Sequence, residues 1–151
     1  MQFLNPKTAA IAAVVGLLGG AVIGHAQASV PAAGLWLSAD GGTKVRVSEC
    51  GGNKLCGTVV WLNEPIDPAT GKPKTDKRNS DPAKRSRPLL GVPVVNGMTP
   101  TGDNKWSGKI YNADDGKTYD AHVTLVSQDA MQVQGCVLSV LCKSQTWKRA
   151  D

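Results

Sequence analysis

Residues 105–137 carry the pattern that most restricts the fold: three runs of alternating apolar and polar side chains. A period of two places one face of a strand on a core and the other in water. Asp115-Gly116 and Ser127-Gln128-Asp129 separate the runs, and Asp-Gly favours tight hairpin turns. The pattern predicts three antiparallel strands that need cover for one face and both edges, with Tyr111 on the polar face. The residues predicted to face inward are Trp106, Gly108, Ile110, Tyr119, Ala121, Val123, Leu125, Met131 and Val133.

Further short strands are predicted on both sides of this meander, at residues 34–37, 43–49, 55–62, 89–95 and 142–149. Residues 96–104 are rich in turn formers, and we expect a link there. The chain is therefore an all-β protein with about eight antiparallel strands. Sequential strands in that number remove their edges by closing into a small up-and-down barrel. A β-sandwich is the alternative.

The first 28 residues have the features of a secretory signal peptide. Lys7 precedes an uncharged run of apolar and glycine residues at 9–23, and Ala26-Gln27-Ala28 is a small-x-small cleavage site. A membrane helix, the alternative, needs about 20 apolar residues. We expect residues 1–28 to be removed. Residues 29–151 would then be a single domain, periplasmic or secreted, with no transmembrane segment after cleavage.

Four cysteines lie in the predicted mature chain, and an even number in an exported domain is typical of disulfides. Four cysteines allow three pairings, and spacing alone does not select one. Because each closely spaced pair brackets a turn sequence, we favour Cys50–Cys56 and Cys136–Cys142. A zinc site is disfavoured, since its usual C-x-x-C spacing is absent.

Residues 63–88 break the strand pattern, because five prolines exclude a long strand or helix there. Residues 72–87 contain seven lysines and arginines and two aspartates, so this segment has a net charge of +5. Long loops in compact domains are often functional, although a solvated loop that keeps the domain soluble has the same composition. The loop has no aromatic side chain for base stacking, so nucleic acid is not an expected partner. Anionic lipid-like groups are the expected partners of this basic loop.

Closure of a barrel would place the first and last strands side by side, with Trp36 near Trp147 or Arg149. Gly34, two residues before this tryptophan, and an arginine on the last strand resemble the signature that closes the base of lipocalin barrels. Further blocks follow in order along the chain: Cys50…Leu55-Cys56-Gly57, Asp76…Asn79, Arg87-Pro88-Leu89-Leu90-Gly91, Trp106…Tyr111, Asp115-Gly116-Lys117-Thr118-Tyr119 and Gln145-Thr146-Trp147-Lys148-Arg149.

With these blocks the chain resembles the bacterial domain-of-unknown-function family numbered 2147, exported proteins with a lipocalin-like β-fold. The resemblance covers nearly all of the predicted mature chain. It implies the fold and export, and it brings no activity and no catalytic residues.

The sequence favours a non-catalytic protein. The predicted mature chain has one histidine, His122, on a polar strand face, and no second histidine to build a metal site with it. No G-x-S-x-G nucleophile elbow, phosphate-binding loop or calcium loop occurs, so no catalytic residue, metal or cofactor is predicted.

Two functions remain open. In the first, the barrel holds a small apolar or anionic amphipathic ligand such as a fatty acid or lipid. In the second, the core is filled and the protein is an envelope interaction module acting through the basic loop at 63–88. No pattern specifies an oligomeric state. The residues predicted to bind the ligand are Trp36, Trp61, Trp106 and Tyr119 in the cavity, and Arg78, Arg85 and Arg87 at its mouth.

Overall fold

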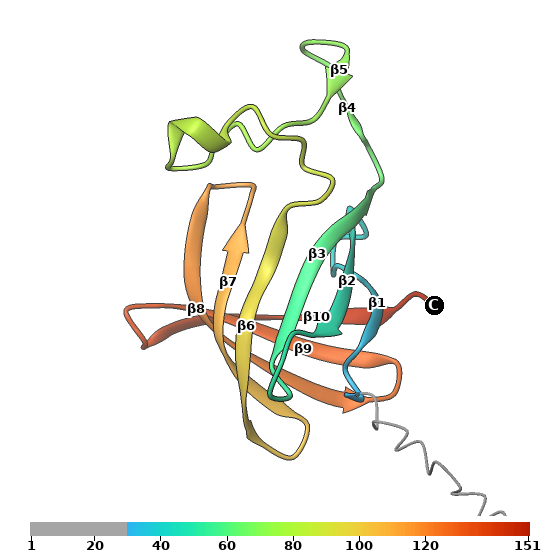
Figure 1. Cartoon of the computed structure of the whole chain (residues 1–151), viewed down its shortest axis with the longest axis vertical. Helices are drawn as coiled ribbons and strands as arrows, with labels where there is room; N and C mark the ends of the chain where they lie inside the picture. The colour runs from blue at the N-terminus through green and yellow to red at the C-terminus, as the bar shows by residue number, and fades with distance from the viewer. Residues whose placement is uncertain (1–29) are drawn as a thin grey trace, which may run out of the picture.

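Eight strands close into an antiparallel barrel in the computed structural model, which describes residues 30–151 (Figure 1). Their order around the barrel is β1-β10-β9-β8-β7-β6-β3-β2. Neighbouring strands are therefore also successive in the sequence, except where β3 pairs with β6 across the long loop and where β1 pairs with β10 to close the barrel. The predicted up-and-down barrel is confirmed. The strands are β1 (Gly34–Leu37), β2 (Thr43–Glu49), β3 (Leu55–Leu62), β6 (Pro93–Gly102), β7 (Lys105–Asn112), β8 (Lys117–Ser127), β9 (Ala130–Val137) and β10 (Leu141–Arg149).

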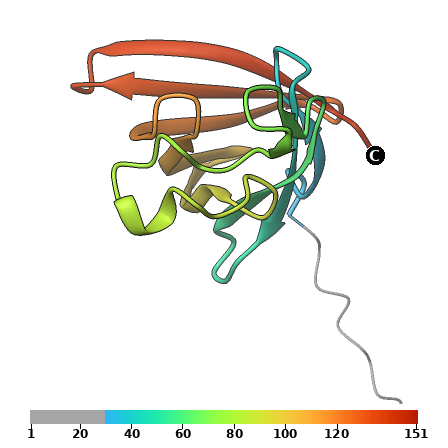
Figure 2. The same cartoon turned by 90° about the horizontal axis from the view of Figure 1, so that it is seen from above.

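The loop between β3 and β6 contains three short elements of its own. β4 (Ile66–Asp67) and β5 (Lys72–Pro73) pair as a separate two-stranded sheet, and η1 (Pro82–Lys84) is one turn of 3-10 helix. Asp81 caps this turn, because its carboxylate accepts a hydrogen bond from the backbone N–H of Ala83. Seen from above, the loop lies over one end of the barrel (Figure 2).

The predicted signal peptide lies outside the described residues. Among residues 30–151, no helix has the length and apolar character to cross a membrane.

The three-strand meander has the predicted register. β7 and β8 pair Trp106 with Val123 and Ile110 with Tyr119, so side chains on one face point together into the barrel. Trp106, Val123 and Met131 are buried, as the alternating pattern predicts. The core is therefore made of residues that the period-two pattern identifies.

One strand prediction was wrong, because β6 runs through the region expected to be a turn-rich link. The register of β6 against β7 shifts between Asn96 and Thr99 and again between Pro100 and Gly102. The first bulge contains Gly97, whose φ is 58°, and a strand interrupted by bulges also tolerates Pro100. Turn-forming residues in this segment therefore mark bulges rather than a loop.

The base of the barrel closes where β1 meets β10, with Trp36 paired with Arg149. The Arg149 guanidinium stacks 4.4 Å from the Trp36 ring centroid, and its two terminal nitrogens donate 2.9 Å hydrogen bonds to the carbonyls of Ala33 and Pro31. A side chain at Gly34 would overlap this guanidinium. The predicted proximity of Trp36 and Arg149 is confirmed, and the packing explains why glycine precedes the tryptophan.

Both favoured disulfides are present. Cys50–Cys56 spans the turn between β2 and β3, and Cys136–Cys142 joins directly opposed residues of β9 and β10. Each one fixes a hairpin.

Candidate functional site

The end of the barrel beneath the long loop is hollow. Its cavity has a volume of about 1140 Å³ and is bounded by the turns that follow β1, β7 and β9 and by residues of the long loop. Small barrels either fill with side chains or hold one small ligand, and this one does both at opposite ends. The apolar walls come from inward positions of five strands: Val45, Val59, Ile110, Val133 and Trp147.

Side-chain size explains why only one end is hollow. Trp36, Leu55, Met98 and Met131 are almost completely buried and fill the base. Toward the mouth the inward residues are mostly valines, and Gly135 contributes no side chain. A Cβ added at Gly135 would have its nearest neighbour 3.8 Å away, so this position leaves open space.

One wall of the cavity is polar. Lys143, Gln145 and Trp147 alternate along β10 and all line the cavity. Lys74, another cation in the lining, pairs with Glu64 at 3.6 Å. Lys143 has no ion-pair partner within residues 30–151, so it is an available cation for an anionic group. The indole N–H of Trp147 is buried without an acceptor in the same part of the chain.

The predicted aromatic residues divide between three places. Tyr119 lines the cavity, and its hydroxyl donates a hydrogen bond to Asp115. This bond raises the pKa of Tyr119. Trp36 and Trp106 are buried in the filled base, away from the cavity. The prediction that Trp61 faces inward was wrong: a bulge opposite Lys44 and Val45 turns it outward, where the Lys44 ammonium lies 4.8 Å from its ring.

The three predicted arginines do not line the cavity. Arg78 donates to the carbonyl of Asp114 at 2.7 Å, and Arg85 donates to the carbonyl of Asn79 at 2.8 Å. Arg87 forms an ion pair of 2.8 Å with Asp76. All three therefore hold the long loop in place, and their predicted contact with a ligand stays a prediction.

Asp76 anchors this loop to the barrel. It is fully buried, and its carboxylate accepts hydrogen bonds from the Tyr111 hydroxyl, from Asn79 at 2.8 Å and from Arg87 at 2.9 Å. Burial alone would raise the pKa of Asp76, but these hydrogen bonds outweigh it and hold the pKa below its ordinary value. Burial, helped by the bond to Asp76, raises the pKa of Tyr111 to about 12.

Tyr111 thus lies on the predicted outer face of β7 but is buried, because the loop covers it. The loop is docked against the outside of the barrel, and its backbone is held at the cavity mouth.

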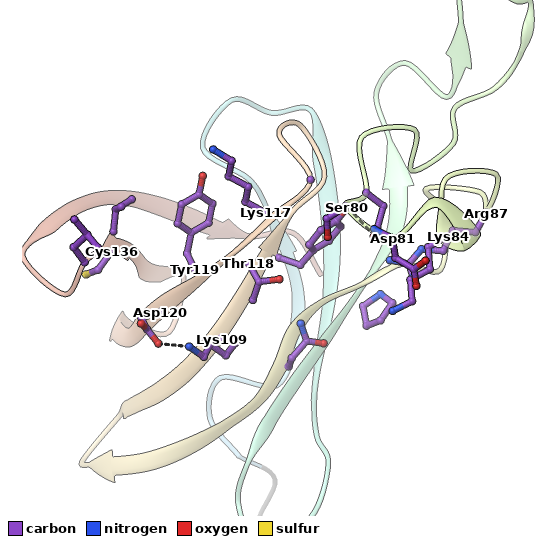
Figure 3. Close-up of a pocket in the computed structure, with 17 residues that line it drawn as sticks. Ser80, Asp81, Lys84, Arg87, Lys109, Lys117, Thr118, Tyr119, Asp120 and Cys136 are labelled. Carbon is purple, nitrogen blue, oxygen red and sulfur yellow. Dashed lines mark hydrogen bonds and ion pairs between the residues drawn. The ribbon is translucent and has the colours of Figure 1, made fainter.

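A second depression lies between this docked loop and the outer face of β7, β8 and β9 (Figure 3). Its volume is about 700 Å³, and its lining is largely polar. Lys109 and Asp120 form an ion pair of 2.6 Å on one side, and Lys84 and Arg87 lie on the other (Figure 3). Val137 and Leu138, at the tip of the β9–β10 hairpin, complete the rim.

Sequence reasoning missed Lys143 and Gln145. The available signal was their spacing: they stand four and two residues before Trp147 on the last strand, so they share its face. Polar residues at inward positions of a strand indicate a wetted interior.

The chain was compared with protein families, with solved structures and with curated proteins. A family model described as "Uncharacterized protein conserved in bacteria (DUF2147)" matches residues 34–149. Among solved structures, the chain is similar to protein HP1028 from Helicobacter pylori, which is described as belonging to the lipocalin family. The identity is 26%, the TM-score is 0.63, and the match covers 79% of this chain and 82% of that one. No curated protein matches the chain.

Proposed function

Since the chain belongs to the bacterial DUF2147 family and its barrel is hollow at one end, we propose that it is a non-catalytic binding protein for a small apolar or anionic amphipathic ligand, such as a fatty acid or lipid. The observation that carries the proposal is the cavity itself, with valines on one wall and hydrogen-bonding groups on another. Burial of apolar surface stabilises a complex by about 25 cal/mol per Å², so even a short acyl chain would gain from these walls.

The two walls suggest how such a ligand would lie. Its apolar part would contact Val45, Val59 and Val133, and its anionic head would approach Lys143. We retain Tyr119 from the sequence prediction, because it lines the cavity. Lys143 takes the role first given to Arg78, Arg85 and Arg87, because these three already bind acceptors of the protein. The hollow end favours this function over a filled-core interaction module.

We also propose that the protein works outside the cytoplasm, in the periplasm or after secretion. Two disulfides in a domain of this size suit an oxidising compartment, and the predicted signal peptide would deliver the chain there.

Filling the cavity tests the proposal. Gly135→Phe would place a ring in the open space, whereas Gly102→Phe adds the same ring on β6, where nothing lies within 4 Å. Protein purified from the bacterial envelope would be examined by native mass spectrometry for co-purified lipid, and then titrated with dodecanoate. We expect Gly135→Phe to lose the co-purified lipid and to lower the affinity for dodecanoate by about tenfold or more. Equal binding by both variants would contradict the proposal.

The head-group contact has its own test. Lys143→Met should lower the affinity for dodecanoate and leave the affinity for its neutral analogue dodecanol nearly unchanged. Lys54→Met, at the turn between β2 and β3, is the matched control and should alter neither. If Lys143→Met lowers the affinity for both ligands equally, Lys143 does not contact the head group.

A further inference from the structure

The tip of the β9–β10 hairpin exposes an apolar cluster. Val137, Leu138, Val140 and Leu141 are 48%, 82%, 78% and 68% exposed, and they are four of the nine large hydrophobic residues exposed in residues 30–151. The hairpin extends past its neighbours at one side of the barrel (Figure 2). Large apolar side chains concentrated at one projecting point indicate an interaction site, because scattered exposure is what an ordinary surface shows.

The tip is also built to keep these side chains in place. Leu138 and Ser139 have φ values of 53° and 60°, the left-handed conformation that hairpin turns normally assign to Asn and Gly. A leucine there costs backbone energy, and such strain is usual where a residue serves function. Cys136 and Cys142 cross-link the two strands just behind the tip. The apolar residues are therefore presented on a fixed hairpin.

Two lysines line the depression whose rim the tip completes. Lys84, on the docked loop, and Lys117, at the start of β8, line the same depression as Val137 and Leu138 (Figure 3). Neither lysine has an ion-pair partner within the described part of the chain, and the surrounding loop segment at 72–87 has a net charge of +5. The surface thus combines a projecting apolar point with free positive charge.

We propose that this hairpin tip inserts into the interface of an anionic lipid bilayer, with Lys84 and Lys117 on the headgroups. Apolar side chains bury into the boundary between headgroups and acyl chains, and nearby lysines add attraction to anionic lipid. A second copy of the chain fits less well, because it would bring two basic surfaces together. Val137, Val140 and Leu141 also line the cavity, so docking would bring its mouth to the bilayer. The docking does not depend on a loaded cavity.

Vesicle co-sedimentation tests the proposal on protein purified from the envelope. The vesicles are phosphatidylcholine alone, or phosphatidylcholine and phosphatidylglycerol in equal parts. The tip variant carries Leu138→Asp, because Leu138 is the one apolar residue of the tip that does not line the cavity. Its matched control carries Val126→Asp, which makes the same charge change at an exposed valine elsewhere on the barrel. All variants share one N-terminal segment, so its contribution is common to them.

We expect the wild type to prefer the anionic vesicles and the tip variant to lose about tenfold or more of that binding. The control should stay within about threefold, because exposed charges far from the lipid are screened. Lys84→Gln with Lys117→Gln should remove the preference for anionic lipid. Near-ultraviolet circular dichroism and dodecanoate affinity without vesicles, unchanged in the tip variant, show that the barrel and its cavity are intact.

Three results would overturn the proposal: equal binding of the wild type to both vesicles, equal loss in the tip variant and its control, or a wild-type dimer in solution that the tip variant abolishes. The last result would assign the tip to a second copy of the chain. Because dodecanoate binding is measured without vesicles, failure of docking and failure of cavity binding are separate outcomes.

Discussion

Gly116, in the turn between β7 and β8, lies against the backbone of Arg78 so closely that any side chain there would overlap the carbonyl oxygen of Arg78. The two residues belong to the barrel and to the docked loop, respectively. The Arg78 side chain reaches back to the carbonyl of Asp114 in the same turn. The turn and the loop are therefore fitted to each other, and the Asp-Gly sequence serves more than hairpin formation.

Gly116→Ala should consequently undock the loop. The φ of Gly116 is 73°, and an alanine in this conformation costs about 1–2 kcal/mol before any overlap is counted. Gly41→Ala is the matched control, since its φ is 72° and nothing lies within 4 Å. We expect Gly116→Ala to lower the free energy of unfolding in urea more than Gly41→Ala does, and to open the lysine-rich loop to trypsin. Equal effects would show that the overlap is relieved without cost.

Asp76 should make stability sensitive to acid. A carboxyl whose pKa is lower in the folded than in the unfolded state, where it is about 3.9, stabilises the fold fully above that value. This contribution is lost as the pH falls through the folded pKa. Asp76→Asn should lower the free energy of unfolding at neutral pH and flatten its decline toward low pH in urea titrations. Asp120→Asn, which breaks an exposed pair, should change stability by less than about 1 kcal/mol. A wild-type acid slope in Asp76→Asn would contradict the assignment.

The Tyr111 hydroxyl should lose its proton at a higher pH than an ordinary tyrosine does. Its pKa is raised to about 12, so the neutral phenol stabilises the fold below the unfolded value of about 10. That contribution disappears as the pH rises through about 12. The chain has two tyrosines, and Tyr119→Phe leaves Tyr111 alone for measurement by tyrosinate absorbance. The same variant unfolded in urea should return a midpoint near 10, and a folded midpoint at that value would show that Tyr111 is not held as described.

Export would remove the N-terminal segment. We expect the protein recovered from the envelope to have an intact mass that lacks residues 1–28, because Ala26-Gln27-Ala28 has small residues where signal peptidase requires them. Ala28→Phe, which places a large residue at the cleavage site, should retain the segment. A wild-type protein that still carries Met1 would exclude cleavage.

The strands were predictable because period-two alternation is local, and β7, β8 and β9 each carry it within a few residues. Trp61 shows the limit of that signal. One extra residue in β3 reverses the faces of all that follow, and nothing in the alternation of Val59, Val60 and Trp61 marks the bulge.

The docked loop could not be predicted for a different reason. Asp76 and Tyr111 are 35 residues apart, and each has a local sequence that predicts exposure. Their burial arises only when the loop folds over the barrel and supplies hydrogen bonds. The hollow end is equally non-local, because it depends on how side chains of different sizes from several strands meet.

The contact between Trp36 and Arg149 determines when the barrel can close during folding. The contacts that seal the barrel join its first strand to Arg149 on β10, so a chain synthesised from its N-terminal side cannot complete the ring until β10 has emerged. Until then β1 and the growing sheet have open edges. A chain with this topology passes through a narrow channel most readily before closure, and loss of β10 would leave an open sheet whose exposed edges can pair with other chains.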